Sequence, residues 1–241
     1  MKKEKKLKSL HEKDKSAATP ESQLDQILEM HENEGSSWKI FKIMTEFVSG
    51  FEFLRRYRGR AVSIFGSARC GGDHCLYKDA RDLAYKLSKD KFAIVTGGGP
   101  GIMEAANKGA YDAGGESVGL NIQLPTEQRV NKYVKESKAF EYFFTRKVML
   151  SFASIAYIFF PGGYGTLDEL FEMLTLIQTK KVEPIPIVLV GREFWQPLFI
   201  WIVDFILKKN QAINSDDLDI IKIVDNAEEA YQYIKSLKIT I

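Results

Sequence analysis

The chain has 241 residues, of which 45% are hydrophobic and 27% are charged, and its formal net charge is +2. This size suits one large α/β domain with a short extension, and this composition excludes a chain that is disordered throughout. The charge is uneven, because residues 1–15 hold seven lysines against three acidic residues, a local +4 that leaves −2 (2 − 4) for the remainder. Such a body does not favour nucleic-acid binding, and we interpret the basic run as a solvated segment.

The cysteines and the apolar runs narrow the class further. Cys70 and Cys75, with His74 beside the second, do not form the paired Cys or His pattern of a zinc site, so we expect no metal. The longest apolar runs have the length of strands, which predicts no membrane span. The N-terminus is basic but lacks the apolar stretch of a secretory signal. We therefore expect a cytoplasmic protein.

The first elements along the chain differ from the rest. Residues 1–35 are rich in Lys, Glu and Ser, which predicts a mobile basic arm, partly helical over 21–30. Residues 38–57 place their apolar side chains at helical spacing on one face. We interpret this stripe as core or dimer packing, at the start of a single domain over 36–241.

Short apolar runs alternate with amphipathic segments from Ala61 onward. Runs that are apolar throughout predict strands buried on both faces, as in a parallel sheet. The sequence therefore predicts an α/β fold of Rossmann-like type, a doubly wound parallel sheet with helices on both faces, plus an N-terminal helical extension. The predicted strands are 62–65, 92–96, 118–120, 155–160, 185–190 and 220–224, and one predicted helix covers 167–177.

Three of the predicted strands end in loops of small residues. In a parallel sheet these loops share the carboxyl edge, where ligands bind. Their glycines let backbone N–H groups approach an anion, and the helix that follows adds its positive end. The pattern predicts a phosphate-binding site. The loops are Gly66-Ser67-Ala68-Arg69, Gly97-Gly98-Gly99-Pro100-Gly101 and Pro161-Gly162-Gly163-Tyr164-Gly165-Thr166.

The details of these loops favour a small phosphate ligand. None contains the Gly-Lys-Ser/Thr of a Walker A loop, which disfavours a triphosphate. The spacing of Gly97, Gly99 and Gly101 is G-x-G-x-G rather than the dinucleotide fingerprint, which disfavours NAD. A monophosphate ligand remains, and no residue demands a metal or a redox cofactor. The histidines lie outside the loops, so histidine acid–base catalysis is not expected.

Three segments carry a resemblance to a known family. Residues 97–107 (GGGPGIMEAAN) and 161–169 (PGGYGTLDE), with Thr145-Arg146-Lys147 between them, resemble the Lonely Guy (LOG) family over about residues 60–210. That family comprises phosphoribohydrolases of cytokinin riboside monophosphates and related purine nucleotides, formerly called putative lysine decarboxylases. The glycine loop at residues 97–101 is one residue shorter than the plant-type pattern. Glu104 follows Met103 where that pattern has glycine. This departure places the chain with the longer bacterial-type branch.

The resemblance implies roles for matching positions. Glu169 would be the catalytic carboxylate, with Arg146 as its charged partner. Residues 162–166 would hold the 5′-phosphate, and Glu104 would contact the ribose. The full set of substrate-binding residues is Gly66, Ser67, Gly97, Gly98, Gly99, Glu104, Lys147, Gly162, Gly163, Gly165 and Thr166. Family members are typically dimers or larger, which implies a homodimer or a larger homo-oligomer here.

The residues also allow plainer interpretations. Thr166 and Glu169 have the T-x-x-E spacing of a capping box, and on spacing alone this role is the stronger. The resemblance favours catalysis, because a buried carboxylate stabilises the oxocarbenium-like charge that builds up when an N-glycosidic bond breaks. Arg146 would keep that carboxylate ionised, or would form an ordinary surface ion pair. Arg69 fits a phosphate contact and a solvent-exposed position equally well.

We therefore predict a hydrolase that splits a purine nucleoside 5′-monophosphate into free base and ribose 5-phosphate. The alternative is a non-catalytic nucleotide- or cofactor-binding carrier on the same fold, because a fold does not fix a function. A third class is a nucleotide-sensing regulator that acts through residues 1–35. The pattern does not identify the base.

Overall fold

A computed structural model describes residues 36–123 and 130–237, so the predicted mobile arm lies outside the described residues. Helix α3 (Ser36–Arg55) comes first, as the apolar spacing predicted. The chain divides into two compact units, Met1–Thr45 and Glu46–Ile241, with the boundary inside this helix. The site described below lies entirely within the second unit.

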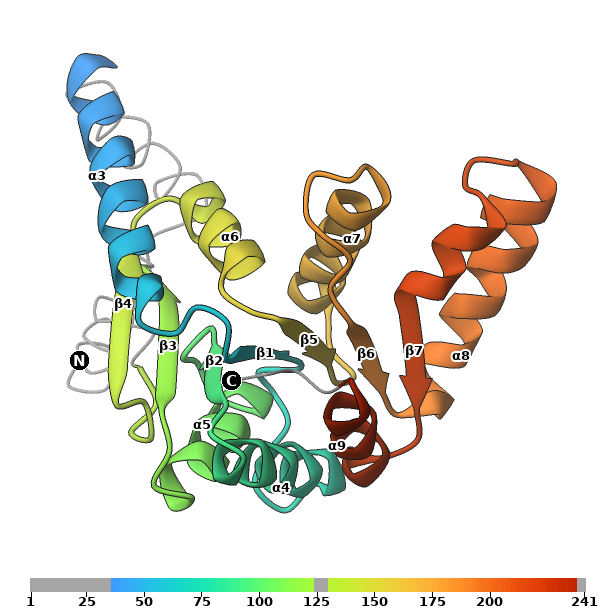
Figure 1. The fold of residues 1–241 in the computed structure, drawn as a ribbon, viewed down its shortest axis with the longest axis horizontal. Helices are drawn as coiled ribbons and strands as arrows, with labels where there is room; N and C mark the ends of the chain where they lie inside the picture. The colour runs from blue at the N-terminus through green and yellow to red at the C-terminus, as the bar shows by residue number, and fades with distance from the viewer. Residues whose placement is uncertain (1–35, 124–129, 238–241) are drawn as a thin grey trace, which may run out of the picture. The chain divides into compact units, whose positions relative to one another are not determined.

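The second unit contains one parallel sheet, which confirms the predicted doubly wound α/β fold. Within the described residues the strand order is β4-β3-β2-β1-β5-β6-β7 (Figure 1). The chain moves outward from β1 to β4 on one side and then from β5 to β7 on the other. The strands are β1 (Ala61–Phe65), β2 (Ala93–Thr96), β3 (Ser117–Ile122), β4 (Glu136–Phe140), β5 (Ala156–Phe159), β6 (Ile187–Val190) and β7 (Ile221–Val224).

Strand β4 was not predicted from the sequence. Its residues 136–140 read ESKAF, which has no apolar run, because β4 lies at the edge of the sheet and most of its side chains are exposed or half-buried. It pairs in parallel with β3, from Val118 opposite Glu136 to Ile122 opposite Phe140. An edge strand needs only one buried face, so the rule that finds buried strands does not find it.

Helices cover both faces of the sheet, as Figure 1 shows. One face packs against α4 (Cys75–Lys89), α5 (Ile102–Asp112) and α9 (Ala227–Ser236). The other packs against the C-terminal end of α3, α6 (Phe143–Phe152), α7 (Tyr164–Gln178) and α8 (Arg192–Trp201). Helix α8 continues as the π-helix η1 (Ile202–Lys209), and the 3-10 helix η2 (Ser215–Ile220) precedes β7.

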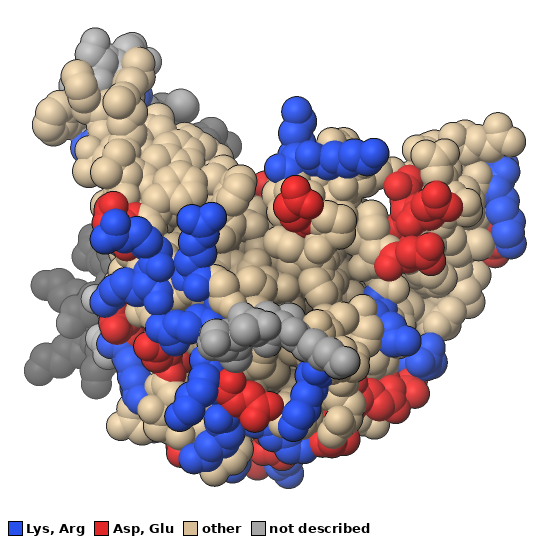
Figure 2. Space-filling view, in the orientation of Figure 1, with Lys and Arg blue, Asp and Glu red and all other residues tan. Residues whose placement is uncertain are grey.

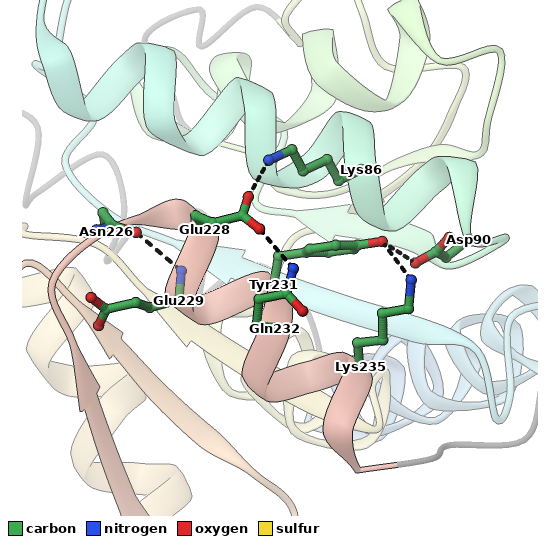
Figure 3. A network of polar contacts seen from close by, with 8 residues as sticks. All are labelled: Lys86, Asp90, Asn226, Glu228, Glu229, Tyr231, Gln232 and Lys235. Atoms are coloured by element: carbon green, nitrogen blue, oxygen red, sulfur yellow. Dashed lines mark hydrogen bonds and ion pairs between the residues drawn. The ribbon is translucent and has the colours of Figure 1, made fainter.

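Helix α9 is fixed to α4 by a polar network (Figure 3). The Tyr231 hydroxyl donates to Asp90 Oδ2 at 2.7 Å, and Lys86 pairs with Glu228. The Asn226 side chain accepts from the Glu229 N–H at 3.0 Å and caps the helix. On the face drawn in Figure 2, basic and acidic side chains are interspersed over α4, α5 and α9. These contacts hold the C-terminal helix on the sheet, on the face that α6 and α7 do not cover.

Candidate active site

The glycine loops meet where the direction of strand order reverses, between β1 and β5. The Ser67 N–H after β1 donates to Pro161 O after β5, at 3.0 Å. The Ser67 carbonyl in turn accepts from the Ile102 N–H at the start of α5, also at 3.0 Å. Gly101 permits this approach, because its φ is +72° and a Cβ there would lie 2.2 Å from Ser67 O. The predicted convergence of the three loops at one edge of the sheet is therefore present.

A pocket of about 670 Å³ opens at this junction. Its volume falls in the range of small-molecule and cofactor sites. Eight of the predicted site residues line it, together with Arg69, whose role the sequence left open. The predicted residues that line it are Gly66, Ser67, Gly97, Arg146, Gly163, Gly165, Thr166 and Glu169.

The first turn of α7 forms one wall of the pocket, and it corrects an expectation from the sequence. Helix α7 begins at Tyr164 with Gly163 as its N-cap, and no side chain caps it. The N–H of Thr166 donates to Gly163 O at 3.0 Å, so Thr166 lies inside the first turn and Glu169 in the second. The alternative interpretation of Thr166 and Glu169 as a T-x-x-E capping box is therefore wrong. The helix starts three residues before the predicted 167, because glycine supplies the N-cap.

This helix start suits an anion. The first N–H groups of an α-helix have no carbonyl partner within the helix, and the helix dipole adds positive potential there. A Cβ at Gly163 or Gly165 would meet no atom within 4 Å, so the space beside both backbones is open. Gly162 lies just before the turn, where a Cβ would come within 2.2 Å of Thr166 Oγ1. The arrangement can bind a phosphate through backbone donors.

Glu169 is a buried carboxyl in this pocket. Its side chain comes from the second turn of α7, and the residue is 8% exposed. The pKa of Glu169 is raised to about 7, and burial is the main cause. Glu172 and Asp168 also contribute to the rise, whereas Lys147 and Arg146 act against it. A carboxyl with a pKa near neutrality can accept or hold a proton at physiological pH.

Arg146 reaches the pocket from α6 on the opposite side. Its Nε donates to Leu120 O at the end of β3, at 2.7 Å. Its guanidinium lies against Gly97, where a Cβ would come within 2.5 Å of the nearest guanidinium nitrogen. Burial lowers the pKa of Arg146, and the negative charge of Glu169 opposes this effect. Arg146 and Glu169 thus bring a basic and an acidic side chain to the same pocket.

Lys147, the next residue of α6, takes a different direction. Its Nζ lies 2.7 Å from Asp168 Oδ2 and 3.1 Å from Glu172 Oε2, both on α7. Lys147 is not among the residues that line the pocket. The predicted Arg-Lys pair thus divides, with Arg146 in the pocket and Lys147 beside it.

The remaining predicted residues, including Glu104 with its predicted ribose contact, do not line the pocket. Gly98 and Gly99 are buried, and their carbonyls accept from Asn131 Nδ2 at 3.1 and 2.9 Å. Glu104 accepts a hydrogen bond from the Tyr77 hydroxyl of α4 at 3.1 Å. These residues shape the second glycine loop and the α4–α5 contact.

Sequence reasoning missed six residues that line the pocket, most of them apolar. Phe143 precedes Arg146 by three residues on α6, a spacing that puts both on one helix face. Tyr164 is the variable residue inside the PGGYGT segment, and it is 91% exposed. Helical spacing from Arg146 was the signal that could have found Phe143. The missed lining residues are Phe65, Ala68, Met103, Phe143, Tyr164 and Asp168.

The other candidate groups have structural partners or lie apart. The His74 ring is the N-cap of α4 and accepts from the Leu76 N–H at 3.2 Å. Cys70 is buried and Cys75 exposed, and both are free thiols. Over residues 36–123 and 130–237, no group of three His, Cys, Asp or Glu side chains could hold a metal ion. In the same ranges, no helix has the length and apolarity that crossing a membrane requires.

Comparisons with known proteins give four matches of interest. A family model described as possible lysine decarboxylase matches residues 103–234. The chain is 35% identical over 125 residues to a probable cytokinin riboside 5′-monophosphate phosphoribohydrolase of Arabidopsis thaliana, covering 50% of this chain and 61% of that protein. It is 33% identical over 128 residues to the cytokinin riboside 5′-monophosphate phosphoribohydrolase LOG of Oryza sativa subsp. japonica, covering 52% of each. The matched part thus spans 52% to 61% of these two relatives.

A solved structure gives the fourth match. The molybdenum cofactor binding protein from the phototrophic bacterium Rippkaea orientalis superposes with a TM-score of 0.57 at 22% identity. The match covers 75% of this chain and 98% of that one. At this identity the likeness shows a shared fold.

Proposed function

The chain belongs to the LOG family, whose family model carries the description possible lysine decarboxylase, and from this premise we propose that it is a nucleoside 5′-monophosphate phosphoribohydrolase. The reaction adds water across the N-glycosidic bond of a purine nucleoside 5′-monophosphate of AMP or cytokinin type. The products are the free base and ribose 5-phosphate. The matched relatives are named as phosphoribohydrolases of cytokinin riboside 5′-monophosphates, which supports this reaction class.

The observation that carries the proposal is the buried carboxyl of Glu169 in a pocket that also offers an anion-binding helix start. Cleavage of an N-glycosidic bond builds positive charge on the ribose ring. An ionised carboxylate fixed nearby, in surroundings of low dielectric, stabilises that charge more than it stabilises the neutral ground state. Because the pKa of Glu169 is about 7, a large fraction of the carboxyl is ionised at neutral pH.

The same carboxylate can direct the water. A carboxylate accepts a hydrogen bond from water and draws its proton as the oxygen attacks the anomeric carbon. The base leaves with the bonding electron pair and is protonated, so atoms and charge balance. The proposal invokes no metal and no nicotinamide cofactor.

The phosphate and the base fit different walls. We assign the 5′-phosphate to residues 162–166, where the first N–H groups of α7 lack a carbonyl partner within the helix, apart from that of Thr166, which donates to Gly163 O. Gly66 and Ser67, after β1, and Gly97 would contact the rest of the nucleotide. Arg146 would bind polar groups of the ligand and keep Glu169 ionised. The aromatic lining at Phe65, Phe143 and Tyr164 offers apolar surface for a base.

The purified protein, incubated with a panel of nucleoside monophosphates, tests the proposal. Chromatography should detect free base and ribose 5-phosphate from at least one purine monophosphate, with neither metal nor NAD added and with a chelator present. Nucleotide binding without release from any member of the panel would contradict it and favour a carrier. A pyrimidine monophosphate serves as the comparison that defines base preference.

We also propose that the protein self-associates. Several apolar residues of α3 and α6 in the second unit are exposed, although apolar side chains at this spacing usually have a packing partner. Covering them with a second copy would remove this apolar surface from water. They are Val48, Phe51, Phe144 and Phe152.

A further inference from the structure

A cluster of three charged side chains joins α6 to α7 beside the pocket. Lys147 Nζ bridges Asp168 Oδ2 at 2.7 Å and Glu172 Oε2 at 3.1 Å. The Lys147 and Glu172 side chains are 21% and 27% exposed. A pair so shielded from water interacts more strongly than an exposed surface pair. Glu169 lies on α7 between the two acidic partners of Lys147.

Helix geometry explains why two adjacent cations act differently. Consecutive residues of an α-helix point about 100° apart, since 3.6 residues make one turn. Arg146 is therefore directed to Leu120 O and Gly97, whereas Lys147 is directed to α7. Asp168 and Glu172 are four residues apart and share one face of α7. From this position the Lys147 ammonium group pairs with both of them.

The charged and titratable groups around Glu169 come from three elements. They are Lys147 and Arg146 on α6, Asp168 and Glu172 on α7, and Tyr157 on β5. The two acids raise the pKa of Glu169 and the two cations lower it, and among the cations the effect of Lys147 is larger. Three acidic groups within five residues would repel one another without a cation among them.

We propose that Lys147 is a positioning residue that acts through Glu169: its ammonium group bridges the two flanking carboxylates and thereby keeps the buried carboxylate of Glu169 negatively charged. The inference rests on the proposed function, because it assigns the charge of Glu169 to catalysis. It differs from the role implied by the family resemblance, in which Lys147 contacts substrate. Arg146 is left as the member of the Arg-Lys pair that lines the pocket.

The test uses the full-length protein in four forms: wild type, Lys147→Met, Lys147→Arg and Glu172→Gln. Methionine keeps an unbranched side chain of similar length and removes the charge, whereas arginine keeps the charge. Lys108→Met is the matched control, because Lys108 forms an ion pair with Asp112 at 3.1 Å and does not line the pocket. NMR titration of isotope-labelled glutamate carboxyl groups gives the pKa of Glu169, whose resonance is assigned by its loss in Glu169→Gln.

We expect opposite shifts in two of the variants. Lys147→Met should raise the pKa of Glu169 by roughly one unit, and Glu172→Gln should lower it. Relative to wild type at each pH, base release by Lys147→Met should then fall roughly tenfold at about pH 6 and less than about twofold at about pH 9. Because the variant and wild type are compared at the same pH, ionisation of the substrate phosphate affects both rates equally and cancels in the ratio. Lys147→Arg and Lys108→Met should keep the wild-type profile.

Two results would overturn the inference. One is a pKa of Glu169 that is the same as in wild type in both Lys147→Met and Glu172→Gln. The other is a loss of activity in Lys147→Met that is equal at every pH and appears in KM, which would make Lys147 a substrate contact. If Lys147→Met does not fold, the direction of the shift in Glu172→Gln decides. If wild type releases no base, the proposed function is wrong. The NMR titration then still tests whether Lys147 affects the pKa of Glu169.

Discussion

The guanidinium of Arg146 occupies the space that a side chain at Gly97 would need. A Cβ built on Gly97 would lie 2.5 Å from Arg146 Nη2 and 2.9 Å from Met103 Sδ. The glycine after β2 thus admits the arginine of α6 to the pocket. The φ of Gly97 is not positive, so the backbone does not require glycine there, and the space that Arg146 needs explains it. The contact also links the second glycine loop to the Arg-Lys pair, about 50 residues later in the sequence.

Gly97→Ala should therefore damage the site more than the fold. Both atoms in the way are the far ends of flexible side chains, so they can move without shifting the backbone, and we expect a stability loss of no more than about 1–2 kcal/mol. The displaced guanidinium should slow base release by at least about tenfold, because misplacement of a contact by about 1 Å is costly to catalysis. Thermal unfolding and steady-state kinetics measure the two effects. Gly71→Ala, where a Cβ meets nothing within 4 Å, is the control, and equal activity in both variants would contradict the account.

Gly165→Ala tests whether a ligand approaches the first turn of α7. A Cβ there would meet no protein atom within 4 Å, so the protein alone does not require glycine. Alanine favours a helix over glycine by up to about 1 kcal/mol, and the variant should be as stable as wild type or more stable. If the phosphate binds at this turn, the added methyl group should weaken nucleotide binding. Calorimetry with AMP measures it, and an unchanged affinity would remove Gly165 from the phosphate site.

The stability of Glu169→Gln should differ from wild type in a pH-dependent way. The ordinary pKa of a glutamate is 4.5, and burial raises that of Glu169 to about 7 in the folded protein. Between these values the folded state holds a proton that the unfolded state has lost, so wild-type stability falls as pH rises through this window. Above pH 7 the cost is complete, on the order of 3 kcal/mol.

Glutamine has no such charge to bury. The variant should therefore be more stable than wild type at pH 8, and the difference should shrink toward pH 5. Urea unfolding at a series of pH values measures it. A difference that does not change with pH would show that the carboxyl of Glu169 is not destabilised by burial.

The sequence predicted the buried strands of the sheet but not the edge strand β4, and burial is the reason. Buried strands such as β5 and β6 have apolar residues at every position, and their runs were found within one or two residues of the observed ends. Strand β4 buries only Phe140 fully, so its pattern does not differ from that of a loop. The register of β4 comes from its pairing with β3, which a single segment does not encode.

The candidate site was predictable where strand ends determined it. The loops after β1, β2 and β5 had to meet at one edge, and their glycines marked the place. The start of α7 was misplaced because Thr166 and Glu169 have the spacing of a capping box, while the glycine at position 163 begins the helix. The direction of Lys147 could not be predicted, since it depends on how α6 is rotated against α7.

Self-association can be measured directly. Light scattering at micromolar concentration should give a mass of at least twice the 27.4 kDa of the chain. Phe152 on α6 is 57% exposed, and Phe152→Glu should shift the mass toward the monomer by placing a charge on the apolar face. A wild-type mass near that of one chain would contradict the proposal.

The most direct test of the central claim compares Glu169→Gln with wild type on one purine nucleoside monophosphate, measuring turnover and equilibrium binding together. Glutamine keeps the size of the side chain and removes the negative charge. We predict that turnover falls by about two orders of magnitude or more, equivalent to roughly 3 kcal/mol of lost electrostatic stabilisation. Binding should largely survive, because backbone groups of residues 162–166 hold the phosphate. A folded variant with a near-normal rate would contradict the assignment of Glu169 as the catalytic carboxylate.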